Sequence, residues 1–355
     1  MIKIVILSII FLNCSYGQVK TILDSLDDPI ALTFVGDNVY LALHGRKPNT
    51  GKLVSFNINN PKESYLELFD SLTYPRAIIV KDDIIYLGLR DEIVMYKLNT
   101  SNKIFDTLIH KTFLFPSSFT FNGDDLIYTH QNAISKINIS NLNPESVLID
   151  VLTERPLSIT NYDKSIYVAT GKSIHRYNLE DNYISVIIKD LEYNIYSILI
   201  RDDFIYLDQS DLSGTGEEIL VYNLKNLESG AQSFCKDLSN VISLAEYEDK
   251  IYFANQRPVN GKPEGKILML EKNLVRQPVE NTIHIYPNPT SNSLTIETLY
   301  INDIEFYLYN SNGTFISHFS NTGNLEMQNF PAGIYLLKYI NNKIAGTKKI
   351  IKVNE

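Results

Sequence analysis

Cysteine is scarce in this sequence, because its 355 residues include only Cys14 and Cys235. Cys14 lies in an N-terminal segment that has the features of a cleaved leader, so we expect Cys235 to be the one cysteine of the mature chain. This predicts that the chain has no intramolecular disulfide. A chain of this length must then obtain its stability from a large apolar core.

Long apolar runs are missing after the N-terminus, so no later segment is long enough to span a membrane as a helix. Residues 1–17 are different: Lys3 precedes an apolar stretch at 4–12, and Ser15 and Gly17 suit the small-residue cleavage site of a secretory signal peptide. The sequence therefore predicts a signal peptide at 1–17 and an exported protein.

Cleavage after this segment would make Gln18 the first residue of the mature chain. The alternative is a lipoprotein acylated at Cys14. Asn13 speaks against it, because such a site normally has a small residue just before the cysteine.

An excess of positive charge is also missing. The whole chain has 32 Lys and Arg against 41 Asp and Glu, and removal of Lys3 with the leader gives 31 minus 41, or −10. A surface of this sign favours solubility and disfavours general binding to nucleic acids or anionic membranes.

No helical periodicity is present, and a strand pattern recurs six times instead. The most regular element is an Ile/Val-Tyr pair whose tyrosines are Tyr40, Tyr86, Tyr128, Tyr167, Tyr206 and Tyr252. Each unit begins with an apolar strand, and these strands lie at 29–35, 75–80, 116–121, 156–161, 195–200 and 241–246. A tight acidic turn, the tyrosine strand, a third strand and a more variable fourth strand follow, which predicts one antiparallel sheet per unit.

Repeated sheets of this kind bury their faces against one another around an axis, so the predicted fold is a six-bladed β-propeller at 18–276. Little sequence remains for a fourth strand after 267–272, whereas residues 19–26 have the pattern of the other fourth strands. We therefore expect the N-terminal strand to complete the last blade and close the ring. In blade number and strand order the region resembles NHL-like, YWTD-like and gluconolactonase-like propellers, but it contains no tryptophan and no YWTD string.

The C-terminal residues form short alternating strands separated by turn formers, which predicts a small, immunoglobulin-like β-sandwich at 283–355 after a linker at 277–282. The sequence of this region includes the motifs YPNP at 286–289, NSLTIE at 292–297, GIYL at 333–336 and KKIIK at 348–352. These motifs resemble the type A C-terminal sorting domain of the type IX secretion system of Bacteroidota. The matching motif residues are Tyr286, Pro287, Asn288, Pro289, Gly333, Tyr335, Lys348 and Lys349.

This resemblance implies a route and a partner. The leader would bring the chain to the periplasm, and the sorting domain would present it to the type IX machinery in the outer membrane. In that family the domain is usually cleaved afterwards, and the cargo is then released or attached to surface lipopolysaccharide. The expected location is the cell surface or the medium.

In propellers, ligands usually bind where the links between blades and the hairpins between second and third strands share one face. Three long hairpins, at 44–52, 209–218 and 255–266, belong to blades one, five and six, which are neighbours in a closed ring. The side chains that we expect at this face and predict to bind a ligand are His44, Arg46, Tyr74, Arg76, Arg90, His130, Arg155, Asp208, Gln209, Asn255, Gln256 and Arg257.

Five of these residues are arginines in an otherwise acidic protein. Because a guanidinium binds carboxylates, sulfates and phosphates through paired donors, we expect an anionic ligand or an acidic glycan. The alternative is that the arginines are paired around the rim with the acidic residues Asp27, Asp28, Glu154 and Asp208. The leading hypothesis is thus a ligand-binding or interaction protein without catalysis.

A second hypothesis is a metal-dependent hydrolase or lactonase, with Ca²⁺ or another divalent ion held in the channel by Asp28, Glu154, Asn194 and Asn240. A zinc site from His44, His130 and His175 is weaker, because these residues belong to different repeats. Motifs for phosphate binding or nucleophilic catalysis do not occur, so no catalytic residue is predicted.

Overall fold

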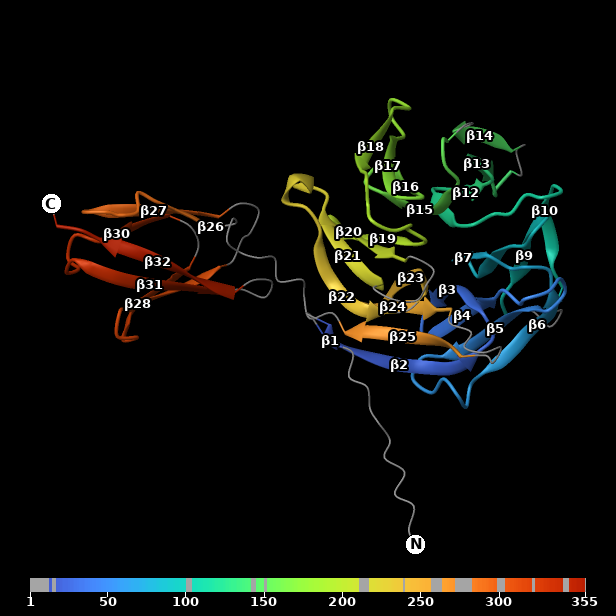
Figure 1. Cartoon of the computed structure of the whole chain (residues 1–355), viewed down its shortest axis with the longest axis horizontal. Coiled ribbons are helices and arrows are strands. Elements are labelled where there is room, and N and C mark those ends of the chain that lie inside the picture. The colour runs from blue at the N-terminus through green and yellow to red at the C-terminus, as the bar shows by residue number, and fades with distance from the viewer. Residues whose placement is uncertain are drawn as a thin grey trace, which may run out of the picture. The chain divides into compact units, whose positions relative to one another are not determined.

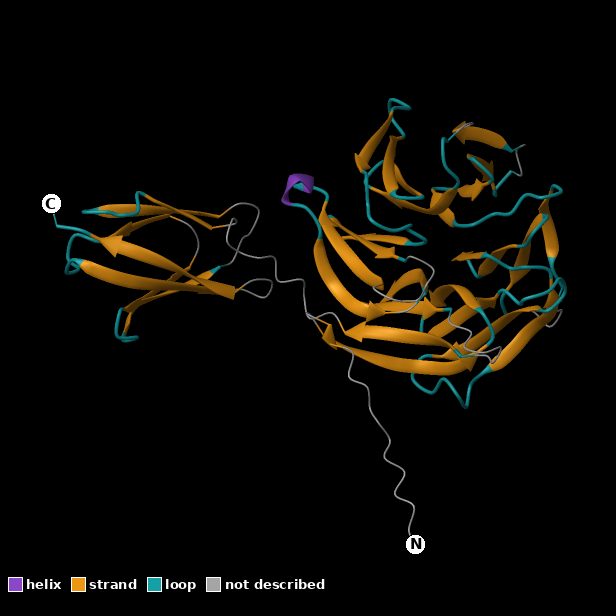
Figure 2. Ribbon diagram, viewed as in Figure 1, coloured by secondary structure: helices purple, strands orange, loops and turns teal. Residues whose placement is uncertain are grey.

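The computed structural model describes residues 13–14, 17–99, 104–141, 145–149, 152–210, 217–238, 240–256, 264–271, 283–298, 304–320, 323–340 and 345–354. Within these ranges the regular structure is β-strand, apart from one 3₁₀ turn, η1 (Leu227–Ser229). The predicted all-β class is therefore confirmed (Figure 2). The chain divides into two compact units, Met1–Lys272 and Asn273–Glu355. No helix among the described residues is long and apolar enough to cross a membrane.

The described strands of the first unit form six antiparallel sheets. Sheet 1 contains β3 (Pro29–Val35), β4 (Asn38–Leu43), β5 (Gly51–Asn57) and β6 (Leu66–Leu72). Sheet 2 contains β7 (Ala77–Lys81), β8 (Ile84–Gly88), β9 (Glu92–Lys97) and β10 (Asp106–His110). Sheet 3 contains β11 (Phe119–Asn122), β12 (Asp125–His130), β13 (Ala133–Asn138) and β14 (Ser146–Ile149). Sheet 4 contains β15 (Pro156–Tyr162), β16 (Ser165–Thr170), β17 (Ser173–Asn178) and β18 (Ile184–Ile188). Sheet 5 contains β19 (Ile198–Arg201), β20 (Phe204–Gln209), β21 (Glu217–Asn223) and β22 (Gln232–Leu238). Sheet 6 contains β23 (Val241–Tyr247), β24 (Lys250–Asn255), β25 (Gly265–Glu271), β2 (Gly17–Leu26) and β1 (Asn13–Cys14).

The N-terminal strand pairs with the last repeat, as the sequence predicts. β2 runs antiparallel to β25, with Val19 opposite Leu270 and Thr21 opposite Leu268 (Figure 1). A strand from the beginning of the unit thus supplies the fourth strand of sheet 6. This pairing removes the edge that β25 would otherwise expose.

Apolar clusters lie between successive sheets rather than within one sheet. One cluster joins sheets 1 and 2 and includes Leu53 and Leu87, and another joins sheets 6 and 1 and includes Leu41 and Ile267. These side chains are fully buried. Because burial of each such side chain contributes about 1.5–3 kcal/mol, the contacts between sheets are the main source of stability in this unit.

The first strands, β3, β7, β11, β15, β19 and β23, contact one another in succession, and β23 also contacts β3. In Figure 1 they lie towards the middle of the unit, and the fourth strands lie at its periphery. A small residue occupies the third position of each predicted first strand: Ala31, Ala77, Ser118, Ser158, Ser197 and Ser243. A small side chain at this position lets the neighbouring backbones approach closely.

Three of the serines at this position also form hydrogen bonds with the next sheet. Ser118 Oγ accepts a hydrogen bond from the Ile159 amide at 3.1 Å, and Ser158 Oγ accepts one from the Ile198 amide at 3.1 Å. Ser197 Oγ does the same for the Leu244 amide at 2.9 Å. The amides belong to the edges of the first strands that do not pair with the second strands, so no strand of their own sheet accepts their hydrogen bonds.

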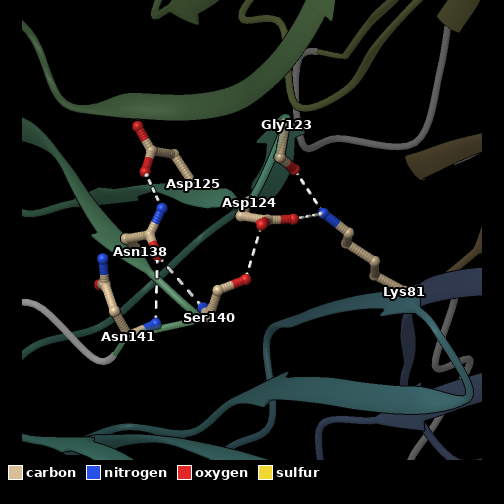
Figure 3. A network of polar contacts seen from close by, with 7 residues as sticks. All are labelled: Lys81, Gly123, Asp124, Asp125, Asn138, Ser140 and Asn141. Carbon is tan, nitrogen blue, oxygen red and sulfur yellow. Dashed lines mark hydrogen bonds and ion pairs between the residues drawn. The ribbon is translucent and has the colours of Figure 1, made fainter.

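The acidic turns between first and second strands form a second set of contacts between sheets (Figure 3). Lys81, at the end of β7, donates to the Asp124 carboxylate at 2.7 Å and also to the Gly123 carbonyl. Between sheets 6 and 1, the Tyr247 hydroxyl donates to the Asp37 carboxylate. The acidic residues thus contribute to packing of neighbouring sheets as well as to tight turns.

A close approach of two sheets explains Gly265. An ideal Cβ at this position would overlap Pro29, the residue that opens sheet 1. The same relation holds between Gly51 and Pro75, which opens the segment leading into sheet 2. Prolines at the starts of first strands therefore pack against glycines of the preceding sheet.

Cys235 corrects one expectation from the sequence. It is buried on β22 and disulfide-bonded, so the prediction of no intramolecular disulfide is wrong for the full chain. The only other cysteine of the sequence is Cys14, and β1, which contains it, contacts β22. The prediction failed because it assumed that residues 1–17 make no contribution to the fold.

In the described part of the second unit, two antiparallel sheets surround one core. The first sheet contains β26 (Ile283–Tyr286), β27 (Ser293–Thr298) and β30 (Gly323–Glu326); the second contains β28 (Glu305–Asn310), β29 (Phe315–Ser320), β31 (Gly333–Ile340) and β32 (Ala345–Lys352). Ile296 from the first sheet and Phe306 and Leu337 from the second belong to the same buried cluster.

The motif residues of this unit hold its two ends together. The Asn288 side-chain amide donates to the Lys349 carbonyl at 2.7 Å and accepts from the Ile351 amide at 2.8 Å. Tyr335 is buried, and its hydroxyl donates to the Pro331 carbonyl at 2.7 Å. Gly333 pairs with Lys352 in the ladder between β31 and β32.

We predict that Ser158→Ala destabilises the first unit. Alanine fits sterically, because Ala31 and Ala77 occupy the same position in sheets 1 and 2, but it leaves the buried Ile198 amide without an acceptor. An unsatisfied buried amide costs about 1–3 kcal/mol. Urea unfolding of the purified chain should show a lower midpoint, whereas Ser146→Ala, at an exposed position on β14, should leave it unchanged. Equal midpoints for the two variants would argue against the role of the hydroxyl.

Candidate anion-binding site

The starts of the first strands and the ends of the second strands lie at one edge of each sheet, here called the start edge. Antiparallel pairing places Pro29 opposite Leu43, and Val241 opposite Asn255. Because the first strands contact one another in succession, the start edges of the sheets lie together. Most of the binding residues predicted from the sequence are therefore on the same side of the unit.

Arg76 and Arg155 form the most unusual feature of the start edge. Arg76 precedes β7 and lies over the Phe115 ring, with Cζ 5.7 Å from the ring centroid. Arg155 precedes β15, and its Nη2 donates to Ser117 Oγ at 3.1 Å. The Nε atom of each guanidinium is buried without a hydrogen-bond partner among the described residues.

Burial and like charge both act on this pair. Burial lowers the pKa of Arg76, the positive charge of Arg155 lowers it further, and the Asp28 carboxylate partly opposes the decrease. Burial also lowers the pKa of Arg155. Neither guanidinium forms an ion pair with a carboxylate in the part of the chain that the structure describes. The pair therefore offers partly desolvated positive charge with unused donors.

Asp28, His44 and Gln256 form a polar group next to this pair. His44 Nδ1 lies 3.3 Å from Asp28 Oδ2, and Gln256 Nε2 donates to Asp28 Oδ1. The His44 ring lies 5.0 Å from the ring of Tyr74, and its Nε2 is buried without a partner. Residues from sheet 1 and sheet 6 are thus joined through one carboxylate.

The other predicted arginines differ from this pair. Arg90 binds the adjacent Asp91 carboxylate at 2.8 Å, and Arg46 lies 3.8 Å from Asp27. For these two, the alternative of local charge pairing is the better description. Arg257 lies outside the described residues.

Asp208, Gln209 and Asn255 are buried at the ends of β20 and β24. Asp208 Oδ1 accepts hydrogen bonds from the amides of Tyr196, at 2.9 Å, and Ser197, at 2.5 Å, so this carboxylate holds the start of β19 in place. Gln209 Nε2 is buried and has no partner among the described residues.

His130 is turned into sheet 3 instead of joining the arginines. Its Nε2 lies 2.8 Å from Ser135 Oγ and 3.8 Å from the Glu145 carboxylate. Burial lowers the pKa of His130 despite the opposing effect of Glu145. This histidine is a packed core residue.

The four oxygen ligands proposed for a metal are spread over the start edge. Asp28 binds Gln256, and the Glu154 carboxylate lies against Gly171. The backbone of Asn194 pairs with Ser210, and Asn240 Oδ1 is buried without a partner. The described residues contain no group of three or more His, Cys, Asp and Glu side chains that could hold a metal ion.

The histidines of the weaker zinc hypothesis each have another contact. His44 lies beside Asp28 and His130 beside Ser135, while His175 Nε2 lies 3.0 Å from Thr170 Oγ1. Burial lowers the pKa of His175, as it does for His130.

Phe115 and Ser117 were missed by the sequence analysis, although both contact the arginine pair. Ser117 could have been found, because it follows Pro116 as Arg76 follows Pro75 in the preceding repeat. Phe115 lies in the link before the strand, where the repeat gives no signal.

A cavity of about 470 Å³ lies elsewhere, between β2 and sheet 1. Its lining includes Leu26 and Tyr65 together with the ion pair of Lys52 and Glu67, whose atoms are 2.6 Å apart. Its lining contains both lysines and carboxylates, so its charges are mixed and the arginine pair has the stronger chemical case for a ligand.

Comparison with known proteins identifies the C-terminal unit. Residues 284–353 match the family model of the secretion system C-terminal sorting domain, so the recognition of a type IX sorting domain is confirmed. No curated protein matches the sequence of the chain.

Solved structures resemble the chain at low identity. A gluconolactonase from Xanthomonas campestris has 9% identity and a TM-score of 0.56 over 74% of this chain and 94% of that chain. A luciferin-regenerating enzyme has 8% identity and a TM-score of 0.54 over 72% of this chain and 95% of that chain. PorZ, a surface component of the type IX secretion system of Porphyromonas gingivalis, has 10% identity and a TM-score of 0.44 over 92% of this chain and 60% of that chain. At such identities the first two similarities indicate a common fold alone.

We predict that the stability of the chain decreases between pH 7 and pH 5. The pKa values of His130 and His175 are lowered in the folded state, so the unfolded chain binds more protons below the ordinary histidine value of about 6.5. The contribution of these neutral histidines to the free energy of unfolding is fully present above that pH and is lost as the pH falls below it. His130→Gln should reduce the pH dependence of the urea midpoint, and His110→Gln, at a side chain 69% exposed, should not. A midpoint that is constant from pH 7 to pH 5 would contradict this assignment.

Proposed function

We propose that the first unit is a six-bladed β-propeller that binds an anionic ligand, such as an acidic glycan, at Arg76 and Arg155 without catalysis. The protein is a β-rich cargo of type IX secretion, and its C-terminal domain directs it to the cell surface or the extracellular space. The propeller, the ligand and the absence of catalysis are the parts that we propose.

Four features support a closed ring. Within sheet 6, the N-terminal strand β2 pairs with β25 of the last repeat. Between sheets 6 and 1, β23 contacts β3, Tyr247 donates to Asp37, and Pro29 packs against Gly265. A ring of six blades would place the start edge at the mouth of a central channel.

We retain the domain boundaries predicted from the sequence as part of the proposal. They are a signal peptide at 1–17, the propeller at 18–276, a linker at 277–282 and a C-terminal immunoglobulin-like sandwich at 283–355. Two facing sheets with a common core support the sandwich.

The observation that carries the binding proposal is the pair of buried, unpartnered guanidinium Nε atoms. An unsatisfied buried donor costs about 1–3 kcal/mol, and more when it is charged. Two such groups with like charge at one place are costly unless an oxyanion or water occupies the space between them. A carboxylate, sulfate or phosphate group would supply the missing acceptors and neutralise the repulsion.

A metal-dependent hydrolase or lactonase remains the second candidate. The unpartnered Oδ1 of Asn240 favours it, because an amide oxygen is a ligand for Ca²⁺. The fold similarity to a gluconolactonase adds only that such chemistry occurs on a similar scaffold. Metal analysis of the purified chain, and unfolding with and without a chelator, would separate this candidate from metal-free binding.

We predict that small oxyanions raise the unfolding temperature of the purified chain and that Arg76→Gln or Arg155→Gln removes most of this effect. The probes are acetate, sulfate and D-glucuronate, with D-glucose as the neutral comparison. Ligand at a hundred times its Kd should stabilise the folded chain by about 2.7 kcal/mol. Each substitution should weaken binding at least tenfold, which corresponds to about 1.4 kcal/mol.

The matched control is Arg176→Gln, because Arg176 lies exposed on β17 and donates to Ser165 on the neighbouring strand. It should bind the probes as the parent chain does. If no oxyanion shifts the unfolding temperature, or if all three variants behave alike, the arginine pair is not a binding site.

We also predict that a chain ending at residue 276 is exported to the periplasm but not to the surface, because it lacks the sorting domain. Cell fractionation would locate the truncated chain. Mass spectrometry should identify an N-terminal peptide that begins at Gln18. An N-terminal peptide that still contains Cys14, linked to the peptide of Cys235, would contradict cleavage after Gly17 and would agree with the disulfide of the full chain.

A further inference from the structure

The start edge carries a second set of unpartnered polar atoms, and it differs in kind from the arginine pair. Gln209 Nε2 and Asn240 Oδ1 are buried and have no hydrogen-bond partner among the described residues. Gln209 ends β20 in sheet 5, and Asn240 directly precedes β23 in sheet 6. These two strands contact each other, so the two side chains belong to neighbouring parts of the edge.

One of these atoms is a donor and the other is an acceptor. A hydroxyl group is both, so a hydroxyl can satisfy an amide N–H and an amide oxygen at the same time. His44 Nε2, on sheet 1, is a third buried atom without a partner. In the neutral tautomer whose Nδ1–H points to Asp28, this nitrogen is an acceptor for another hydroxyl.

The carboxylates on this side limit the charge of a ligand. Asp28 lies beside His44 and Gln256, and Asp208 lies next to Gln209 in sequence at the end of β20. A second negative charge placed over sheets 5, 6 and 1 would be repelled by both. The cationic part of the edge suits one anionic group, and the neutral part suits hydroxyls.

We propose that the site binds a polyhydroxylated monocarboxylate of the sugar-acid class, free or as the acidic residue of a glycan. This rests on the proposed function, because Arg76 and Arg155 bind the carboxylate. Gln209 and Asn240 bind hydroxyls of the same molecule, and His44 accepts from another. Gln209 and Asn240 therefore determine specificity, while the arginines supply most of the affinity.

Isothermal titration calorimetry of the purified full chain with three probes tests this proposal. D-Glucuronate has both groups, hexanoate has a carboxylate without hydroxyls, and D-glucose has hydroxyls without charge. We expect D-glucuronate to bind at least tenfold more tightly than either of the others. Hexanoate would leave the buried amide groups without partners, and the tenfold difference corresponds to about 1.4 kcal/mol.

Two variants locate the specificity. Gln209→Met keeps the length of the side chain without its amide, and Asn240→Gly tolerates the left-handed backbone at this position, where φ is 48°. Each should weaken D-glucuronate binding about tenfold and leave hexanoate binding unchanged. Unchanged hexanoate binding also shows that the variant is folded. If a variant does not fold, the comparison of probes on the parent chain still decides.

The outcomes separate this inference from the function on which it rests. If D-glucuronate and hexanoate bind equally and both depend on Arg76, the anion site stands and the sugar-acid inference is wrong. If neither carboxylate binds, both are wrong. If D-glucose binds as tightly as D-glucuronate and the arginine variants have no effect, the site recognises neutral sugars and both proposals are also wrong.

Discussion

The contact between successive first strands is the constraint on which the first unit depends. One edge of each first strand is not paired with the second strand of its sheet, and the amides at that edge need acceptors from the preceding sheet. Ser118, Ser158 and Ser197 provide them through their hydroxyls, and Ala31 and Ala77 keep the same position small in the first two sheets. A larger residue would separate the sheets, and the apolar clusters between them would lose their packing. A small residue recurs at this position in every repeat because the first strands must be equally spaced there.

Equal spacing also explains why polar residues can gather at the start edge. Once the first strands are in contact, the residue before each strand lies next to its counterparts from other sheets, whatever its side chain is. Arg76 and Arg155 come from sheets that are not consecutive, yet the charge of Arg155 lowers the pKa of Arg76. Their burial costs stability, and the apolar clusters between sheets offset that cost. A site of this kind can change its side chains without changing the framework.

Local contacts decided which parts could be predicted from the sequence. The strands and the pairing of β2 with β25 followed from alternation and from counting, because each repeat contains the same signals. Pairing of Arg90 with the adjacent Asp91 could also be read from the sequence. The proximity of Arg76 to Arg155 and the partners of His130 could not, because they depend on how sheets far apart in the sequence are placed. The prediction for Cys235 failed for another reason, because residues 1–17 were treated as a cleaved leader that does not contribute to the fold.

The motif residues of the C-terminal unit stabilise the fold of that unit. Asn288 and Tyr335, two of its motif residues, use their side chains to hold its own backbone, through the Lys349 and Pro331 carbonyls. Lys348 and Lys349 lie on β32, and Ile350 between them and the end of the strand is fully buried in the core. Motifs of this kind can recur on unrelated cargo because they specify a self-contained fold. The side-chain contacts of these motif residues thus lie within their own unit, and the ligand site that we propose is at the start edge of the first unit.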